Sequence, residues 1–241
     1  MPPMSSAEEL AREKDLAARA AIRRVHPGAT VALGTGSTAA YAVRALAERF
    51  PKGGLDCVSS SLATTELAVS LGLSVRALGE DDQFDVMLDG ADEVDPHLAM
   101  TKGGGGALLR EKVLARLSKE VLILVDHTKL VPRLGTRAAI PVEVVPFARP
   151  AVAKHLRERR IASVLRAGSD GTPRLTDNGN EILDLTPPGP IDDPAALEQE
   201  LRGIPGIVET GLFLGLASRV YVGLPDGTVH EILPGSGGRS P

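Results

Sequence analysis

The sequence predicts an α/β protein with a doubly wound, mainly parallel sheet (Rossmann-like) and a smaller ferredoxin-like α+β domain. In the first half of the chain, short apolar segments alternate with helix-forming segments, a pattern typical of parallel strands connected by crossover helices. After about Ile140 the expected order becomes β-α-β-β-α-β, which is the order of a ferredoxin-like domain. We therefore expect helices on both faces of the first sheet.

The first domain begins with an Ala-rich helix over residues 6–25, which ends before Pro27-Gly28. The strands that follow are short runs of mainly aliphatic residues, and the helices between them are rich in Ala and Leu. Strands are expected at residues 30–33, 57–59, 74–78, 85–88 and 121–125, and helices at residues 39–50, 62–71 and 107–117.

In the second domain, strands are expected at residues 142–145, 163–166, 181–185 and 207–210, and helices at residues 150–159 and 194–201. A last strand pair, residues 219–222 and 228–232, is joined by the turn Pro225-Asp226-Gly227 and is expected to return to the first sheet. The predicted domains are residues 1–139 with 215–234 for the α/β domain, 140–214 for the ferredoxin-like domain, and 235–241 for a flexible tail.

The composition is that of an ordinary globular chain of 241 residues, with 43% hydrophobic and 24% charged residues. A net charge of −4 without a basic block argues against a nucleic-acid-binding face. The single cysteine, Cys57, excludes an intramolecular disulfide, and its apolar surroundings predict a buried core residue. The five histidines show no metal-ligand spacing, and neither a signal peptide nor a membrane-spanning run is visible, so a cytoplasmic location is expected.

Four polar clusters follow predicted strands, at residues 34–38, 89–92, 102–111 and 126–129. In an open α/β sheet, ligands bind beyond the carboxyl ends of the strands. Their common location therefore predicts one binding region, and it is a stronger signal than any single cluster.

The cluster at residues 102–111 contains four consecutive glycines, which leave main-chain N–H groups open to a ligand at the start of a helix. Lys102 can neutralise a phosphate or an enediolate oxygen, and the Glu111 carboxylate can move a proton. A flexible loop followed by an ordinary surface glutamate is an equally simple interpretation of this segment alone.

The loop Gly34-Thr35-Gly36-Ser37-Thr38 joins a strand to a helix and suits a phosphate monoester. It also matches the G-x-G-x-x-A dinucleotide pattern, but the next strand ends in Ser59-Ser60-Ser61 where that pattern needs an acid. The third interpretation is a helix capped by serine, with no ligand.

In the acidic segment, Asp89 and Asp92 could contact sugar hydroxyls and share proton transfer, whereas Gly90 and Ala91 do not fit a calcium loop. Glu93 and Asp95 are expected to be solvated. Lys129 is a second candidate cation, with a surface lysine as the alternative, and His127 is the only histidine expected near the site.

These clusters, in this order, resemble the type A ribose-5-phosphate isomerases. The similar segments are Gly34-Thr35-Gly36-Ser37-Thr38, Asp89-Gly90-Ala91-Asp92, Lys102-Gly103-Gly104, Leu109-Arg110-Glu111-Lys112, Asp126-His127-Thr128-Lys129, Pro141-Val142-Glu143-Val144, Thr176-Asp177-Asn178-Gly179-Asn180, Pro205-Gly206-Ile207-Val208 and Gly211-Leu212-Phe213. The resemblance extends from the first helix nearly to the C-terminus.

The resemblance implies an isomerase of the non-oxidative pentose phosphate pathway that interconverts D-ribose 5-phosphate and D-ribulose 5-phosphate through a cis-enediolate. It implies Glu111 as the proton-transferring base, Asp89 and Lys102 as further catalytic residues, no metal or cofactor, and a homodimer or homotetramer. The implied substrate-binding residues are Thr35, Gly36, Ser37, Thr38, Asp89, Gly90, Ala91, Asp92, Lys102, Gly103, Gly104, Gly105 and Lys129. The roles of Asp89 and Asp92 could be exchanged. A non-catalytic sugar-phosphate sensor and a dinucleotide-dependent oxidoreductase remain as alternatives.

Overall fold

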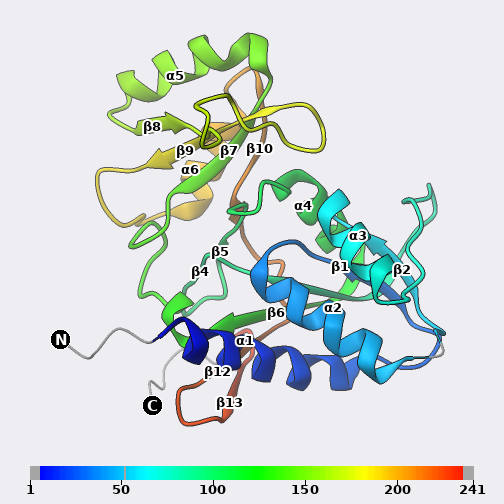
Figure 1. Cartoon of the computed structure of the whole chain (residues 1–241). Helices are drawn as coiled ribbons and strands as arrows, with labels where there is room; N and C mark the ends of the chain where they lie inside the picture. Colours follow the sequence, from blue (N-terminus) through cyan, green and yellow to red (C-terminus); the bar gives the residue numbers. More distant parts are fainter. Residues whose placement is uncertain (1–5, 52, 236–241) are drawn as a thin grey trace. The chain divides into compact units, whose positions relative to one another are not determined.

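The computed structural model describes residues 6–51 and 53–235, and the chain divides into two units (Figure 1). The first unit contains the described chain up to Ala91, Val113–Lys129 and the described chain from Leu216 onward. The second contains Asp92–Lys112 and Leu130–Gly215. None of the described helices combines the length and the apolar character that crossing a membrane requires.

The first unit is built on a six-stranded sheet of order β13-β12-β6-β3-β1-β2. Neighbouring strands from β2 to β12 are parallel, and only β13 is antiparallel to its neighbour. The strands are β1 (Thr30–Leu33), β2 (Asp56–Ser59), β3 (Phe84–Gly90), β6 (Ser118–Asp126), β12 (Arg219–Gly223) and β13 (Val229–Ile232). The mainly parallel sheet is thus confirmed, and the last strand pair returns to it as predicted.

Helices α1 (Ala7–Ala21) and α2 (Ser37–Arg49) contact each other and the strands of this sheet (Figure 1). The helix α1 starts at a capping box, in which Ser6 and Glu9 each accept the other's backbone N–H. Its alanines pack with alternate strand residues such as Leu33 and Leu124, in an aliphatic core. The intervening residues of the strands are also buried, as expected for parallel strands covered on both faces. The remaining elements are η1 (Ile22–Arg24), α3 (Leu62–Ser70) and η2 (His127–Lys129), and the last residues of α4 (Leu108–Arg116), from Val113 onward, also belong to this unit.

The strand predicted at residues 74–78 is wrong. Only one bridge forms there, between Val75 and Cys57 of the edge strand β2, supported by the Arg76 N–H bond to the Cys57 carbonyl at 2.9 Å. Ala77 and Leu78 are exposed, so the segment has no apolar face to hold a longer strand against the sheet. The strand predicted at residues 85–88 is longer than expected, because Asp89 and Gly90 still pair within β3.

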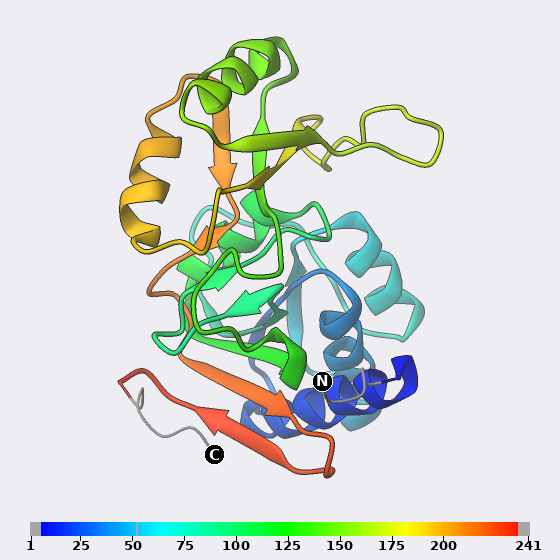
Figure 2. The ribbon, with the colours of Figure 1, turned by 90° about the vertical axis from the view of Figure 1, so that its left-hand side faces the viewer.

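The second unit contains an antiparallel sheet of order β10-β7-β9-β8, which confirms the ferredoxin-like arrangement (Figure 2). Its elements are β7 (Ile140–Val144), η3 (Pro146–Ala148), α5 (Arg149–Glu158), β8 (Ala162–Leu165), β9 (Glu181–Thr186), α6 (Pro194–Arg202) and β10 (Ile207–Thr210). Both helices cover the same face of the sheet, because Val152 and Leu156 of α5 and Leu201 of α6 share a core with Val142 and Leu185.

A small second sheet in this unit was not predicted. It has the order β11-β5-β4 and consists of β4 (Glu93–Val94), β5 (Met100–Thr101) and β11 (Leu212–Phe213). Strands of two residues are too short to show periodicity in a sequence. Glu93 is buried here and accepts the N–H groups of Gly135, Arg137 and Ala138, so the expectation of a solvated Glu93 is wrong.

The units differ from the predicted domain boundaries chiefly at residues 92–112 and 130–139, which lie in the second unit. Which segments fold independently remains a prediction. Most of the predicted tail, residues 236–241, lies outside the described residues.

Candidate active site

In the first unit, the loop at residues 34–36 passes from β1 into α2 directly beside the end of β3. The Gly34 N–H donates to the Leu88 carbonyl at 2.9 Å, and a Cβ on Gly34 would lie 2.1 Å from Cγ of Asp89. Only glycine permits this approach. Gly36 has φ +108°, a conformation that also favours glycine, immediately before the helix begins at Ser37.

The structure brings two predicted clusters of this unit together. A Cβ on Gly90 would lie 3.3 Å from Cβ of Thr38, and Asp89 is completely buried next to Gly34. The segment after β2 supports the same loop, since the Thr35 and Ser60 hydroxyls are 2.7 Å apart and the Thr64 hydroxyl donates to the Gly34 carbonyl at 3.0 Å. The first turn of α2 and the carboxylate of Asp89 therefore form one polar group.

Sequence reasoning missed Lys14, a cation in this group. Lys14 Nζ donates to Ser37 Oγ at 3.3 Å and lies 3.8 Å from Oδ2 of Asp126 at the end of β6. The preceding residue, Glu13, is buried and accepts from Nδ1 of His127 at 2.6 Å. A glutamate four residues before Ala17, on the apolar stripe of α1, is the sequence signal that Glu13 has a buried polar partner.

The other predicted cation, Lys129, lies in η2, which follows β6 directly. It is half-buried, as is its neighbour His127, whose ring is held by Glu13. Helix α1 thus attaches to the cluster at residues 126–129 as well as to Ser37.

In the second unit, Lys102 and Glu111 form a buried ion pair. Lys102 Nζ is 3.2 Å from Glu111 Oε2, and the two side chains are 4% and 2% exposed. Glu111 lies in the first turn of α4, where the helix dipole favours a carboxylate. Charges buried this deeply are tolerated only with a close partner, so the pair is held in a defined geometry.

Asp92 and the glycine loop also meet. The Gly104 N–H donates to Asp92 Oδ2 at 2.9 Å, and a Cβ on Gly104 would lie 2.8 Å from Oδ1 of the same carboxylate. A side chain at position 104 would therefore displace the Asp92 carboxylate from this contact. The second unit brings together Asp92, Lys102, the loop of Gly103, Gly104 and Gly105, and Glu111.

Phe213 of β11 is a further neighbour that the sequence did not reveal. The Nζ atoms of Lys102 and Lys112 lie 5.3 and 4.8 Å from the centre of its ring, within cation–π range. Lys112 is buried as well and donates to Glu209 Oε1 and to the Thr210 carbonyl, both at 2.9 Å. One aromatic ring thus lies close to the ammonium groups of both buried ion pairs.

A family model described as ribose 5-phosphate isomerase A (phosphoriboisomerase A) matches residues 56–227. The chain belongs to the ribose 5-phosphate isomerase A family. A ribose-5-phosphate isomerase A from Chloroflexus aurantiacus is 50% identical over 220 residues, which are 90% of this chain and 92% of that protein.

Two solved structures of ribose 5-phosphate isomerases have the same fold. One, a D-ribose-5-phosphate isomerase in complex with phospho-erythronic acid, has a TM-score of 0.88 at 36% identity, and the other, ribose 5-phosphate isomerase A from Methanocaldococcus jannaschii, has a TM-score of 0.87 at 38% identity. Each comparison covers 95% of this chain and 100% of the other. The resemblance and the fold class inferred from the sequence are thereby confirmed.

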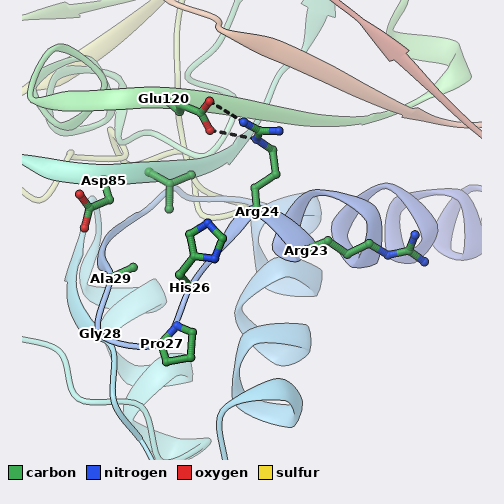
Figure 3. A pocket seen from close by; sticks show the side chains of 9 residues that line it. Arg23, Arg24, His26, Pro27, Gly28, Ala29, Asp85 and Glu120 are labelled. Carbon is green, nitrogen blue, oxygen red and sulfur yellow. Dashed lines mark hydrogen bonds and ion pairs between the residues drawn. The ribbon is translucent and has the colours of Figure 1, made fainter.

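A separate cavity of about 620 Å³ opens at the amino ends of β1, β3 and β6 (Figure 3). Its two carboxylates are already engaged. Arg24 binds Glu120 through two hydrogen bonds of 2.7 and 2.9 Å, and a hydrogen bond from Lys119 is the main cause that lowers the pKa of Asp85 to about 2. None of the lining residues is a candidate site residue of this ribose 5-phosphate isomerase A family member, so the cavity is not the candidate active site.

Cys57 is buried in β2, and burial raises the pKa of its thiol to about 11. The thiol is therefore neutral at ordinary pH and unsuited to nucleophilic attack. The prediction that Cys57 is a core residue is confirmed.

Proposed function

We propose that this protein interconverts D-ribose 5-phosphate and D-ribulose 5-phosphate through a cis-enediolate, with Glu111 as the proton-transferring base. The observation that carries the proposal is the buried pair of Glu111 and Lys102, 3.2 Å apart, at the junction of the glycine loop and α4. It places a carboxylate base and an oxyanion-stabilising ammonium side by side. Such a pair is what an aldose–ketose isomerisation requires.

In the proposed reaction, the Glu111 carboxylate removes the proton from C2 of the open-chain aldose. The C2–H electrons form the C1=C2 double bond, and the carbonyl electrons move to O1, which becomes the enediolate oxygen. O1 then takes the proton of the O2 hydroxyl, the O2 electrons form the ketone, and C1 receives the proton from Glu111. One carboxylate on one face of the sugar serves both carbon atoms, a contribution of about 10²–10⁴-fold to the rate.

Lys102 and the amides of the glycine loop stabilise the enediolate oxygens in this proposal. Loss of one such donor typically costs about 10²–10³-fold. Asp92, beside Gly104, holds a sugar hydroxyl, and Asp89 assists ring opening or relays a proton between hydroxyls. These two roles can be exchanged.

We assign phosphate binding to Thr35, Gly36, Ser37 and Thr38, at the start of α2, with Lys129. The assignment is supported by the close packing of this loop on Asp89 and Gly90, by the N-terminal end of a 13-residue helix and by the ammonium of Lys14 at Ser37. We add Lys14 to the phosphate-binding residues, because a second cation there offsets the two charges of a phosphate monoester. Gly90 and Ala91 complete the proposed substrate contacts.

We further propose that the protein acts without metal or cofactor, as a homodimer or homotetramer in the cytoplasm. The resemblance to type A isomerases supports each of these statements. Light scattering of the purified protein distinguishes the two oligomers from a monomer.

The decisive experiment measures conversion of ribose 5-phosphate in EDTA by the wild type, Glu111→Gln and the control Glu158→Gln, an exposed glutamate of α5. We expect robust wild-type and control turnover, and a loss of at least about a hundredfold in Glu111→Gln with the substrate still bound. Unchanged turnover in Glu111→Gln would instead move the base to Asp89 or Asp92. Tight binding without any wild-type turnover would indicate a sugar-phosphate sensor.

A further inference from the structure

The glycine loop needs an anchor, because its own backbone does not fix its shape. Gly103 and Gly106 both have positive φ, +104° and +86°, and the turn between them is closed by a single hydrogen bond from Gly106 N–H to the Gly103 carbonyl, 3.0 Å long. Glycine loses more conformational freedom on ordering than any other residue. A loop of four glycines that binds substrate in one conformation must therefore be held from outside.

Arg166, directly after β8, makes that connection. Its Nη1 donates to the Gly103 carbonyl at 2.8 Å and to the Gly104 carbonyl at 3.2 Å. Its Nε and Nη2 bind both carboxylate oxygens of Asp184 in β9. The side chain is only 14% exposed, so these bonds are largely shielded from water. One planar guanidinium thus ties the loop to the antiparallel sheet.

The two sides of the loop are held by different partners. Arg166 binds the carbonyls of Gly103 and Gly104, while Asp92 accepts the Gly104 N–H. The peptide between Gly103 and Gly104 is therefore fixed at both its oxygen and its nitrogen. Lys102 immediately precedes this peptide, and its own N–H is bound to the Gly211 carbonyl at 2.9 Å.

We propose that Arg166 is a positioning residue for the reaction, which orders the loop of Lys102, Gly103, Gly104 and Gly105 for substrate. This inference rests on the proposed function of the loop. Arg166 touches no reacting atom. It acts by holding the exposed backbone of Gly104 and Gly105 in the conformation that meets the sugar, and Asp184 keeps the guanidinium in place.

A lysine cannot replace Arg166. The arrangement uses donors on three nitrogen atoms of one rigid plane, whereas an ammonium offers three donors from a single point. Arg166→Lys is therefore expected to keep the charge and lose most of the loop ordering. A role limited to joining β8 and β9 would predict lower stability in the variants and unchanged kinetic constants of the folded protein.

The experiment compares Arg166→Ala and Arg166→Lys with Arg149→Ala in full-length protein. Arg149 is a matched control, because it pairs with Glu181 of the same strand β9 at 2.7 Å and does not belong to the loop contacts. Steady-state kinetics with ribose 5-phosphate are measured beside thermal unfolding. We expect kcat/KM to fall about 10- to 100-fold in both Arg166 variants, chiefly through KM, and to stay within about twofold of wild type in Arg149→Ala.

Chemical rescue distinguishes a positioning role from a purely structural one, because a purely structural role predicts no recovery of activity. Guanidinium at low millimolar concentration should restore part of the kcat/KM of Arg166→Ala, whereas urea at the same concentration should not. Kinetic constants equal to those of Arg149→Ala would overturn the inference, as would equal effects of guanidinium and urea. If Arg166→Ala does not fold, the Arg166→Lys variant decides the question. Wild-type kinetic constants in that variant would by themselves overturn the inference.

The result separates this inference from the proposed function. Glu111→Gln tests the base independently of the loop. If Glu111→Gln abolishes turnover and the Arg166 variants keep wild-type constants, the proposed function stands and the positioning role fails. If Glu111→Gln keeps turnover, the proposed function fails whatever Arg166 does.

Discussion

At the scale of single residues, we expect the buried pair of Lys102 and Glu111 to contribute to both stability and turnover, and the two contributions can be measured separately. Lys102→Met leaves the Glu111 charge buried without its ammonium partner, so the free energy of unfolding should fall by about 3–5 kcal/mol. Turnover should be lost at the same time. Urea unfolding at neutral pH measures the first effect, and the isomerase assay measures the second.

The double variant Lys102→Met, Glu111→Gln is the control for this prediction. It removes both charges, so it should regain most of the stability lost in Lys102→Met and remain inactive. A double variant as unstable as the single one would mean that the packing of Lys102, against Phe213 among others, matters more than charge balance.

Lys14 carries a prediction that separates phosphate binding from proton transfer. Its Nζ lies 3.3 Å from Ser37 Oγ. Lys14→Met should therefore weaken phosphate binding, so that the inhibition constant of inorganic phosphate and KM both rise by about tenfold. The turnover number should change far less, because the proposed base and the proposed enediolate donors are other residues. Lys154→Met, an exposed lysine in α5, is the control, and an equal effect there would argue against a specific site.

At the scale of elements, the amino ends of β1, β3 and β6 are held by ion pairs that make stability depend on pH. A hydrogen bond from Lys119, followed by bonds from Thr30, lowers the pKa of Asp85 to about 2. A carboxylate with a lowered pKa stabilises the fold above its unfolded pKa of about 3.9, and this contribution disappears as the pH falls toward 2.

Asp85→Asn removes this contribution. The difference in melting temperature between wild type and variant should be present at pH 7 and shrink between about pH 4 and pH 2. Because Asp85 and Lys119 are substantially exposed, we expect a small difference that salt reduces further. A difference independent of pH over this range would assign the effect to the bonds with Thr30 rather than to charge.

The elements also show what the sequence could predict. The helices and the longer strands were found because their apolar periodicity reflects burial, as in β6 with its run of aliphatic residues. Residues 74–78 have the composition of a strand, but only tertiary packing reveals that Val75 alone meets β2. In the sheet β11-β5-β4 each strand has two residues, and β11 pairs with β5 from more than a hundred residues away, which no local pattern encodes.

The residues of the candidate site also fall into those that the sequence predicts and those that it does not. Residues at strand ends or beside glycines, such as Glu111 and Asp89, can be proposed from chemistry and spacing. Lys14, Arg166 and Phe213 could not, because what distinguishes each of them is a contact with a distant segment, to Ser37, Gly103 and Lys102 respectively. Such contacts between distant segments leave no pattern in the sequence.

At the scale of the whole molecule, the division into two units bears on whether a fragment of the chain can fold by itself. Residues 140–214 contain all strands of the ferredoxin-like sheet, yet its core also includes Val131 and Leu134, which precede this range. Glu209 in β10 is paired with Lys112, which precedes it as well. A fragment of residues 140–214 would expose part of its core and leave a buried carboxylate without its cation.

We therefore expect the fragment 140–214 to lack a cooperative unfolding transition, although it contains the complete β-α-β-β-α-β order. Circular dichroism during urea titration of the fragment and of the full chain tests this. The full-length variant Lys112→Met shows separately how much the lost ion pair contributes, and it should still unfold cooperatively with a stability reduced by about 3–5 kcal/mol. A sharp transition in the fragment would instead support the boundaries read from the sequence, and would mean that Val131, Leu134 and Lys112 attach to a core that is already stable on its own.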